Sequence, residues 1–263
     1  MINQHDIPVT EVDLGPGIRA FYTSRSGGCS VGAYEGLNVG DAVGDAADAV
    51  ESNRDALGAF TGTSVNYLRQ VHGNAVVDVT ASDARNSRTP GAERQADGAV
   101  TSDPAVALCV YVADCVPVLL ADPVARIIGS AHAGRPGLEA RIISHTIELM
   151  VCQGADASRI RAAVGPCICP RCYEVPAEMA LRFAQNTGTV VSQTQWDTPG
   201  IELRVAAHKE LAAAGVAQIV HVDVCTYESG ELYSHRWSTH HAEDTGGASG
   251  RFAGIVRLDV PKK

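Results

Sequence analysis

The chain has 263 residues, of which 45% are hydrophobic and 19% charged, and its formal net charge is −9 at pH 7. The length allows one large domain with a sizeable core, and the acidic excess argues against a nucleic-acid partner, whose binding surface needs clustered Lys and Arg. Residues 1–17 lack the pattern of a secretion signal and no stretch reaches the ~18 apolar residues of a membrane helix, so we expect a cytoplasmic protein with no membrane partner.

The first elements alternate between strand and helix patterns. Residues 18–24 predict a strand, and the Gly pair that follows permits a tight turn. On that turn Arg25 either holds an anion or faces solvent. Residues 46–60 carry apolar side chains at helical spacing and predict a helix.

Two short apolar runs then flank His72-Gly-Asn, which predicts a β-hairpin with His72 near its turn, beside Gln70. The polar stretch of residues 82–95 predicts an exposed loop. Three closely spaced apolar strands follow, in residues 106–112, 116–121 and 126–131, and we expect them at the centre of a sheet.

The stretch from Tyr111 to Gly137 carries the most suggestive chemistry. Cys115 precedes the second of these strands and His132 ends the third, so both lie where a strand meets a loop. One helix is predicted from residue 138 to 150, and its N-terminal N–H groups would lie near His132 and could bind an anion.

The second half of the chain continues the mixed pattern. Strands are predicted in residues 160–165, 218–225 and 252–258, helices in residues 176–187 and 201–214, and a flexible polar lid or loop in residues 232–250.

Three kinds of chemistry fit the candidate residues. His72, Cys115 and His132 could bind a metal with one position left open, as in catalytic zinc sites. Alternatively, Cys115 could be a nucleophile with His132 as its base and Asp114 as the orienting acid. Two His and one Cys also describe a copper site, but a multicopper oxidase needs many His ligands in close pairs, and this chain has nine His and no His-X-His.

Two further groups of residues are relevant. The segment Cys167-Ile-Cys-Pro-Arg-Cys172 supplies three thiols without an obvious fourth ligand, and free thiols are the favoured interpretation. Nucleoside chemistry would need a phosphate site, which Arg25, Arg69, Arg135 and the helix after Gly137 could supply.

Seven short motifs occur in order along nearly the whole chain: Thr23-Ser-Arg-Ser-Gly-Gly, Gln70-Val-His-Gly, Ala96-Asp-Gly-Ala-Val-Thr, Ala113-Asp-Cys-Val-Pro-Val, His132-Ala-Gly, Gly165-Pro-Cys-Ile with Tyr173-Glu-Val, and Cys225-Thr. Together they resemble the YfiH-type family, which is also labelled laccase-domain or multicopper polyphenol oxidoreductase and peptidoglycan editing factor. The resemblance implies that residues 1–263 form a single α+β domain, a layered α/β/β(/α) sandwich of mixed sheets with flanking helices, similar to a toxin-deamidase fold.

The resemblance also implies an activity and a site. The activity is phosphorolysis of adenosine, inosine and methylthioadenosine, with deamination of adenosine, by a monomer or homodimer. Zinc, or copper, would be bound by His72, Cys115 and His132. Asp114 would complete the catalytic group, and the predicted contacts of nucleoside and phosphate are Arg25, Gln70, Arg135 and Tyr173.

The chain departs from the family in one place near this site. The family pattern His-Ala-Gly-Trp-Arg-Gly is replaced here by His132-Ala-Gly-Arg-Pro-Gly137, so the role of the family's Arg would pass to Arg135. Three alternatives stay open at this point: a metal-free Cys–His hydrolase or amidase acting on a peptidoglycan precursor, a copper-dependent polyphenol oxidase, and a non-enzymatic partner-binding protein.

Overall fold

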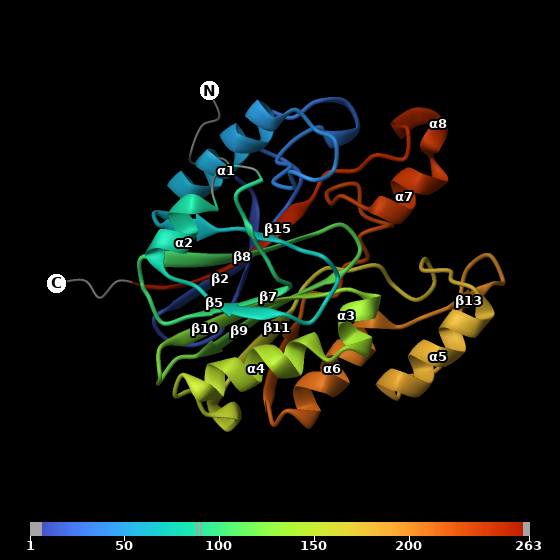
Figure 1. Ribbon diagram of the computed structural model, residues 1–263. Helices are drawn as coiled ribbons and strands as arrows, with labels where there is room; N and C mark the ends of the chain where they lie inside the picture. Colours follow the sequence, from blue (N-terminus) through green and yellow to red (C-terminus); the bar gives the residue numbers. More distant parts are fainter. Residues whose placement is uncertain (1–6, 88, 90, 260–263) are drawn as a thin grey trace.

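A computed structural model of the chain describes residues 7–87, 89 and 91–259. Two large β-sheets stack face to face, and helices cover the outer face of each one (Figure 1). The layers therefore follow the order helix, sheet, sheet, helix. This confirms the predicted α+β fold with mixed sheets and flanking helices.

The sheet nearest the candidate site has six strands. In spatial order they are β14 (Gln218–His221), β11 (Arg161–Val164), β9 (Val116–Asp122), β10 (Ile127–Ala133), β7 (Gly98–Thr101) and β5 (Val76–Asp78). The two edge pairs, β14 with β11 and β5 with β7, are parallel, whereas the central pairs are antiparallel.

The second sheet has five strands. In spatial order they are β1 (Val9–Val12), β2 (Ile18–Thr23), β15 (Phe252–Leu258), β8 (Val106–Val112) and β3 (Ser64–Asn66). Two small pairs complete the strands, β4 (Leu68–Arg69) with β6 (Arg94–Gln95) and β12 (Ser192–Gln193) with β13 (Pro199–Gly200).

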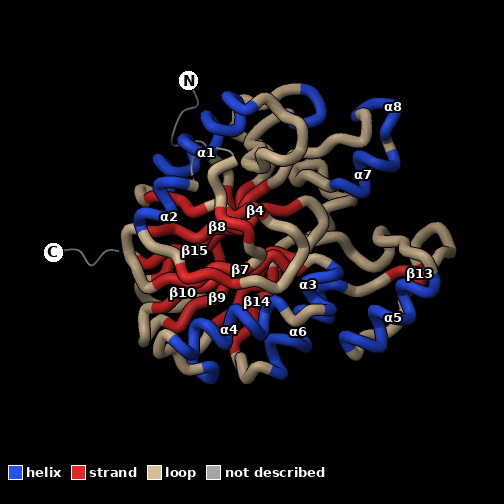
Figure 2. Tube along the Cα trace, in the orientation of Figure 1, coloured by secondary structure: helices blue, strands red, loops and turns tan. Residues whose placement is uncertain are grey.

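Helices close both outer faces of the stacked sheets (Figure 2). On the five-stranded sheet lie α1 (Ala47–Thr61) and α2 (Ala81–Asn86). Over the six-stranded sheet lie α3 (Arg135–Glu139), α4 (Ile142–Cys152) and α6 (Leu203–Ala213), with α5 (Ala177–Thr187) packed against α3 and α6. Two short helices, α7 (His235–His240) and α8 (Ala242–Thr245), come late in the sequence, and 3₁₀ turns span Gly32–Tyr34 and Ala157–Arg159.

The strand sequences explain why both sheets are buried. Successive side chains of a strand point to opposite faces. In β8, Val106 and Leu108 pack between the two sheets, whereas Ala107 and Cys109 pack toward α1. Every residue of β8, β9 and β10 is buried, so continuous apolar runs rather than alternating ones form the central strands.

The prediction of a hairpin around His72 is wrong. The strands before His72 pair elsewhere, β3 with β8 and β4 with β6, and the strand after it, β5, pairs in parallel with β7. Gly-Asn predicts a hairpin only where the two flanking runs pair with each other, and here each finds a longer-range partner.

Three other expectations are corrected. The expected loop of residues 82–95 contains most of α2 and the strand β6, although residues 88 and 90 of it lie outside the described residues. The expected lid of residues 232–250 contains α7 and α8. Helix α7 begins after Ser234, whose hydroxyl accepts a hydrogen bond from Trp237 N–H. The single helix expected after Gly137 is divided into α3 and α4 by Arg141, whose φ of 62° interrupts the helix.

No helix in the described ranges has the length and apolar character needed to cross a membrane. Residues 1–6, part of the segment in which no secretion signal was expected, lie outside the described residues.

Candidate active site

The hairpin of β9 and β10 brings Cys115 beside His132. These strands are antiparallel, and their register pairs Ala133 with Val116 and His132 with Pro117. Cys115 immediately precedes the first pair, so its side chain lies next to the end of β10. The predicted arrangement, in which Cys115 precedes one apolar strand and His132 lies at the end of the next, is therefore observed.

Asp97 holds the backbone of His72 next to Cys115 and His132. Because β5 and β7 are parallel, with Val76 opposite Gly98, the segments that precede them lie together. The Asp97 carboxylate accepts hydrogen bonds from the backbone N–H groups of Val71, His72 and Gly73, at 2.8–3.2 Å. These bonds hold His72 in the left-handed region, at φ 59°.

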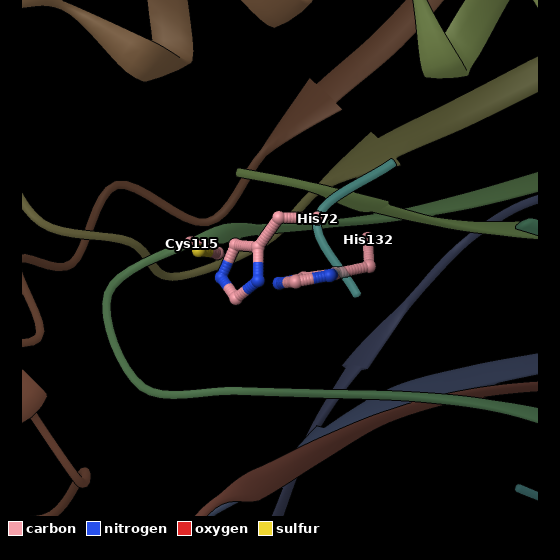
Figure 3. Close-up of side chains that lie close together, drawn as sticks. All are labelled: His72, Cys115 and His132. Carbon is pink, nitrogen blue, oxygen red and sulfur yellow. The ribbon is translucent and has the colours of Figure 1, made fainter. Parts of the chain in front are cut away.

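The ligand atoms of His72, Cys115 and His132 all lie within 4.8 Å of one another (Figure 3). The two imidazole rings meet edge to face, with 4.7 Å between centroids. Gly134 permits this approach, because a Cβ there would lie 2.8 Å from His72 Cδ2 and 2.9 Å from Cys115 Sγ. Both contacts are closer than real Cβ atoms allow, so the glycine is required by the packing of the two side chains.

Asp97 also fixes the orientation of the buried His132 ring. Its Oδ1 lies 2.8 Å from His132 Nδ1, which leaves Nε2 available on the side of Cys115 and His72. A carboxylate that holds one ring nitrogen is the usual support for a histidine that binds metal through the other. The donor set of two imidazoles and one thiol, with this support, fits a three-ligand zinc site with an open fourth position.

The charges in this cluster are strongly coupled. Burial alone raises the pKa of the Cys115 thiol, but the His132 and His72 imidazoles outweigh burial and lower it to about 6. Burial disfavours the charged form of His132 as well, whereas the Cys115 thiolate and Asp97 raise its pKa to about 9. In the absence of a metal, Cys115 and His132 therefore form a thiolate–imidazolium pair at neutral pH.

A cavity of about 620 Å³, here called the site cavity, includes these three side chains in its lining. Four arginines also line it: Arg69, Arg135, Arg236 and Arg251. Among its described lining residues Asp114 is the only carboxylate. The site cavity is thus locally cationic in a chain of net charge −9.

Two of these guanidiniums are available to an anion. In the described part of the chain, Arg69 and Arg251 form no ion pair with a carboxylate, and Arg251 is held by the carbonyls of Ser249 and Gly250 at 2.7 and 2.9 Å. Arg135 is already engaged, since its Nη1 donates to Glu139 Oε2 at 2.5 Å.

The predicted residues Asp114, Gln70 and Tyr173 line the site cavity too. Asp114 has φ 95°, and its carboxylate accepts from the Thr226 hydroxyl and from Arg236 N–H, both at 2.6 Å. Gln70 exchanges two hydrogen bonds with the backbone of Tyr111. Burial raises the pKa of Tyr173 to about 12, so its phenol keeps its proton at neutral pH.

Arg25 lies elsewhere. Its guanidinium donates to the Glu35 carbonyl and stacks on Tyr233, and it lines two other cavities. It is not among the residues that line the site cavity. The anion site expected at the start of the helix after Gly137 is also altered, because α3 has only five residues and Arg135 is its first.

Four residues of this site were given no role from the sequence: Asp97, His235, Arg236 and Arg251. Asp97 lies in the Ala96-Asp-Gly motif, directly before a buried strand. An Asp at such a position often accepts hydrogen bonds from nearby backbone N–H groups. Arg236 belongs to α7, in the segment interpreted as a lid. Their convergence depends on pairings between distant strands, which a local pattern does not contain.

A larger cavity of about 1080 Å³ lies beside α1 and α2. Its lining includes Arg54 and Tyr67 but no His or Cys among the described residues. Arg54 is tied to Glu93 at 2.6 Å and stacks on Tyr67, so its charge is already compensated. The chemistry of the molecule therefore points to the site cavity instead.

The sequence matches a family described as "Multi-copper polyphenol oxidoreductase laccase" over residues 19–259. A Streptomyces griseus protein named purine nucleoside phosphorylase ORF3 is 42% identical over 241 residues, which cover 90% of this chain and 93% of the relative. A Corynebacterium glutamicum protein, also named purine nucleoside phosphorylase, is 36% identical and covers 92% of this chain and 94% of its own.

Solved structures show the same fold. YlmD from Geobacillus stearothermophilus superposes with a TM-score of 0.83 at 30% identity, covering 93% of both chains. A Neisseria meningitidis protein of the DUF152 family superposes with a TM-score of 0.82, also at 30% identity, over 96% of this chain and 99% of its own. Shared fold and sequence extend over the whole region that forms the site cavity.

Proposed function

The chain belongs to the multi-copper polyphenol oxidoreductase laccase family, and we propose that it is a zinc-dependent purine nucleoside phosphorylase that also deaminates adenosine. The proposed nucleosides are adenosine, inosine and methylthioadenosine. We propose further that residues 1–263 form one domain, which acts in the cytoplasm as a monomer or homodimer. Relatives that cover the chain almost end to end are named purine nucleoside phosphorylase, which supports this choice of reaction.

One observation carries the proposal: a His₂Cys cluster shares a cavity with four arginines. Phosphate is a dianion near neutral pH, and the surface of a chain with net charge −9 repels it unless a local cluster of cations compensates. Guanidinium groups bind phosphate through paired N–H donors. We assign phosphate to Arg251 and Arg69, which are free of carboxylate partners in the described residues, with Arg236 beside them.

Phosphorolysis breaks the bond between the ribose C1′ and the purine nitrogen and forms a bond between C1′ and a phosphate oxygen. The purine leaves with the bonding electrons and takes up a proton, so the products are the free base and ribose 1-phosphate. The protonated Tyr173 phenol can donate a hydrogen bond to the substrate, because its pKa is about 12. Asp114 is fixed by Thr226 and Arg236 N–H, which orients its carboxylate in the cavity wall.

Deamination replaces the adenosine amino group by the oxygen of water and releases ammonia. His72, Cys115 and His132 would hold the zinc ion, with Asp97 keeping His132 Nδ1 occupied and Nε2 directed to the ion. When bound, zinc would supply Lewis acidity for the attack of water. The lowered pKa of Cys115 suits this role, because a thiolate is the form that binds metal.

The proposal is tested by release of hypoxanthine from inosine, measured with and without phosphate in zinc-loaded protein. Cys115→Ala should lose the metal ion of the His₂Cys site and the activity together, whereas Cys152→Ser, which changes an exposed thiol at the end of α4, should keep both. Full metal content and full activity in Cys115→Ala would refute the proposed site.

A second candidate is a metal-free Cys–His hydrolase. The thiolate–imidazolium pair of Cys115 and His132, oriented by Asp97, is the arrangement of an activated cysteine nucleophile. Chelation separates the two candidates. A hydrolase keeps its turnover after metal removal and forms an acyl adduct on Cys115, whereas the phosphorylase and deaminase activities that we propose return only when zinc is added back.

A further inference from the structure

A second group of metal-binding side chains lies outside the site cavity. The sulfur atoms of Cys169, Cys172 and Cys225, here called the thiol cluster, all lie within 4.8 Å of one another. Cys167, which the sequence places with the first two, is buried apart from this group. The cluster therefore combines a Cys-X-X-Cys turn with a third cysteine from a distant segment.

The pairing of two strands at the edge of the six-stranded sheet brings these segments together. Strands β11 and β14 are parallel, so the chain leaves both at the same end of the sheet. A backbone β-bridge between Cys167 and Cys225, both of which are free thiols, continues their pairing. The turn from Cys169 to Cys172 is closed by a hydrogen bond from Cys172 N–H to the Cys169 carbonyl, at 3.0 Å.

Two sulfurs of the thiol cluster accept hydrogen bonds from N–H groups. Cys169 N–H donates to Cys225 Sγ at 3.3 Å, and the Gln195 side-chain amide donates to Cys172 Sγ at 3.5 Å. Such donors stabilise thiolates, which is the form of cysteine that binds metal.

The Glu228 carboxylate lies beside one sulfur of the thiol cluster. Its Oε1 lies 3.6 Å from Cys172 Sγ. In a tetrahedral zinc site with Zn–S of about 2.3 Å and Zn–O of about 2.0 Å, a sulfur and an oxygen ligand lie about 3.5 Å apart. Arg171 holds the same oxygen at 2.6 Å, so a guanidinium already offsets part of the negative charge that three thiolates and a carboxylate would bring.

We propose that Cys169, Cys172, Cys225 and the Glu228 carboxylate bind one structural zinc ion. Four protein ligands leave no open position, so this site would be closed, in contrast to the His₂Cys site. The ion would clamp the segments after β11 and β14. These segments carry Tyr173, which lines the site cavity, and Thr226, which fixes Asp114 at 2.6 Å.

The test is made in a His72→Ala, His132→Ala background, which removes the first site and so separates the two proposals. Protein purified under reducing conditions should contain one zinc per chain by elemental analysis. Adding Cys172→Ser and Cys225→Ser should reduce the content to zero, and adding Cys152→Ser, which changes an exposed thiol remote from the cluster, should leave it at one.

Cobalt substitution gives a second readout in the same background and needs no cysteine variant. The intensity of the thiolate-to-cobalt charge-transfer band should correspond to three thiolates. Glu228→Gln should weaken zinc binding by at least the ~10-fold typical of a lost outer-shell partner. The proposal is overturned if the background protein binds no zinc, or if its mass shows that two of the three thiols form a disulfide under reducing conditions.

Discussion

Asp97→Asn is the substitution that most sharply tests how the His₂Cys site is built. The change keeps the shape of the side chain but replaces one carboxylate oxygen by an NH₂ group. Oδ1 accepts from His72 N–H and lies against His132 Nδ1, and Oδ2 accepts from Gly73 N–H. Whichever way the new amide turns, its NH₂ group faces a position that now donates a proton.

Each orientation has a different cost. If the NH₂ group replaces Oδ2, it faces Gly73 N–H and that hydrogen bond is lost. If it replaces Oδ1, it faces His132 Nδ1, which must then accept, so the proton moves to Nε2 and blocks the atom that would bind metal. One hydrogen bond to a charged group is worth about 1.5–3 kcal/mol, which corresponds to a loss of roughly 10–150-fold in affinity. Loss of an outer-shell partner typically weakens metal binding by about 10–100-fold.

The assay is competition for zinc with a chromophoric chelator, together with thermal unfolding of the metal-free protein. Asp122→Asn is the matched control, because Asp122 is also buried and also accepts backbone N–H groups, from Val124 and Ala125. It ends β9, whose seven residues span about 20 Å from the Cys115 end. Asp122→Asn should lower stability without changing zinc affinity. A zinc affinity for Asp97→Asn within twofold of the wild type would refute the reasoning.

Three further outcomes are expected. In metal-stripped protein, alkylation of Cys115 by iodoacetamide should reach half its maximal rate near pH 6, because the neighbouring imidazoles lower the thiol pKa and the thiolate accumulates above it; a midpoint near the ordinary thiol value would contradict the coupling. Arg251→Gln should raise the KM for phosphate by about 10–100-fold through loss of a charge-assisted hydrogen bond, and unchanged phosphate kinetics would remove Arg251 from the phosphate site; Arg182→Gln, on the exposed side of α5, is its control. Gly134→Ala should abolish zinc binding at the His₂Cys site, since its Cβ would occupy space taken by the His72 and Cys115 side chains, whereas Gly230→Ala meets no atom within 4 Å and should bind zinc there normally; normal binding by both would argue against the role of Gly134.

The parts that local sequence predicts well are those that local interactions determine. The apolar runs of β9 and β10, with a polar turn between them, predict an antiparallel pair whose ends bring Cys115 near His132. The helices α1 and α5 likewise show their apolar spacing and end at Gly62 and Gly188, both in the left-handed conformation.

The parts that local sequence misses depend on distant pairing. His72 joins the site because β5 pairs in parallel with β7, which brings Asp97 under the backbone of residues 71–73. A Gly-Asn turn between two apolar runs gives the same local pattern as a hairpin, so spacing alone favours the wrong partner. The family resemblance implied that His72, Cys115 and His132 are ligands but gave Asp97 no role.

The positive lining of the site cavity was predicted only in part, for the same reason. Arg69 and Arg135 were expected near phosphate and do line the cavity. Arg236 and Arg251 come from a short helix and from the residue before the last strand, and nothing in their spacing indicates that they join the other two. Arg25 illustrates the opposite error, because a basic residue on a glycine turn looks like an anion site but stacks on Tyr233 instead. Tertiary arrangement, rather than residue type, determines which cations share a cavity.

We propose above all that phosphate cleaves a purine nucleoside in the site cavity and is joined to the C1′ atom of its ribose. The most direct measurement follows phosphorus by NMR while zinc-loaded protein is mixed with inosine and phosphate. We expect a ribose phosphate ester to appear in amounts equal to the hypoxanthine released, and Cys115→Ala to form neither product. Release of hypoxanthine without consumption of phosphate, or an equal yield from Cys115→Ala, would contradict this proposal.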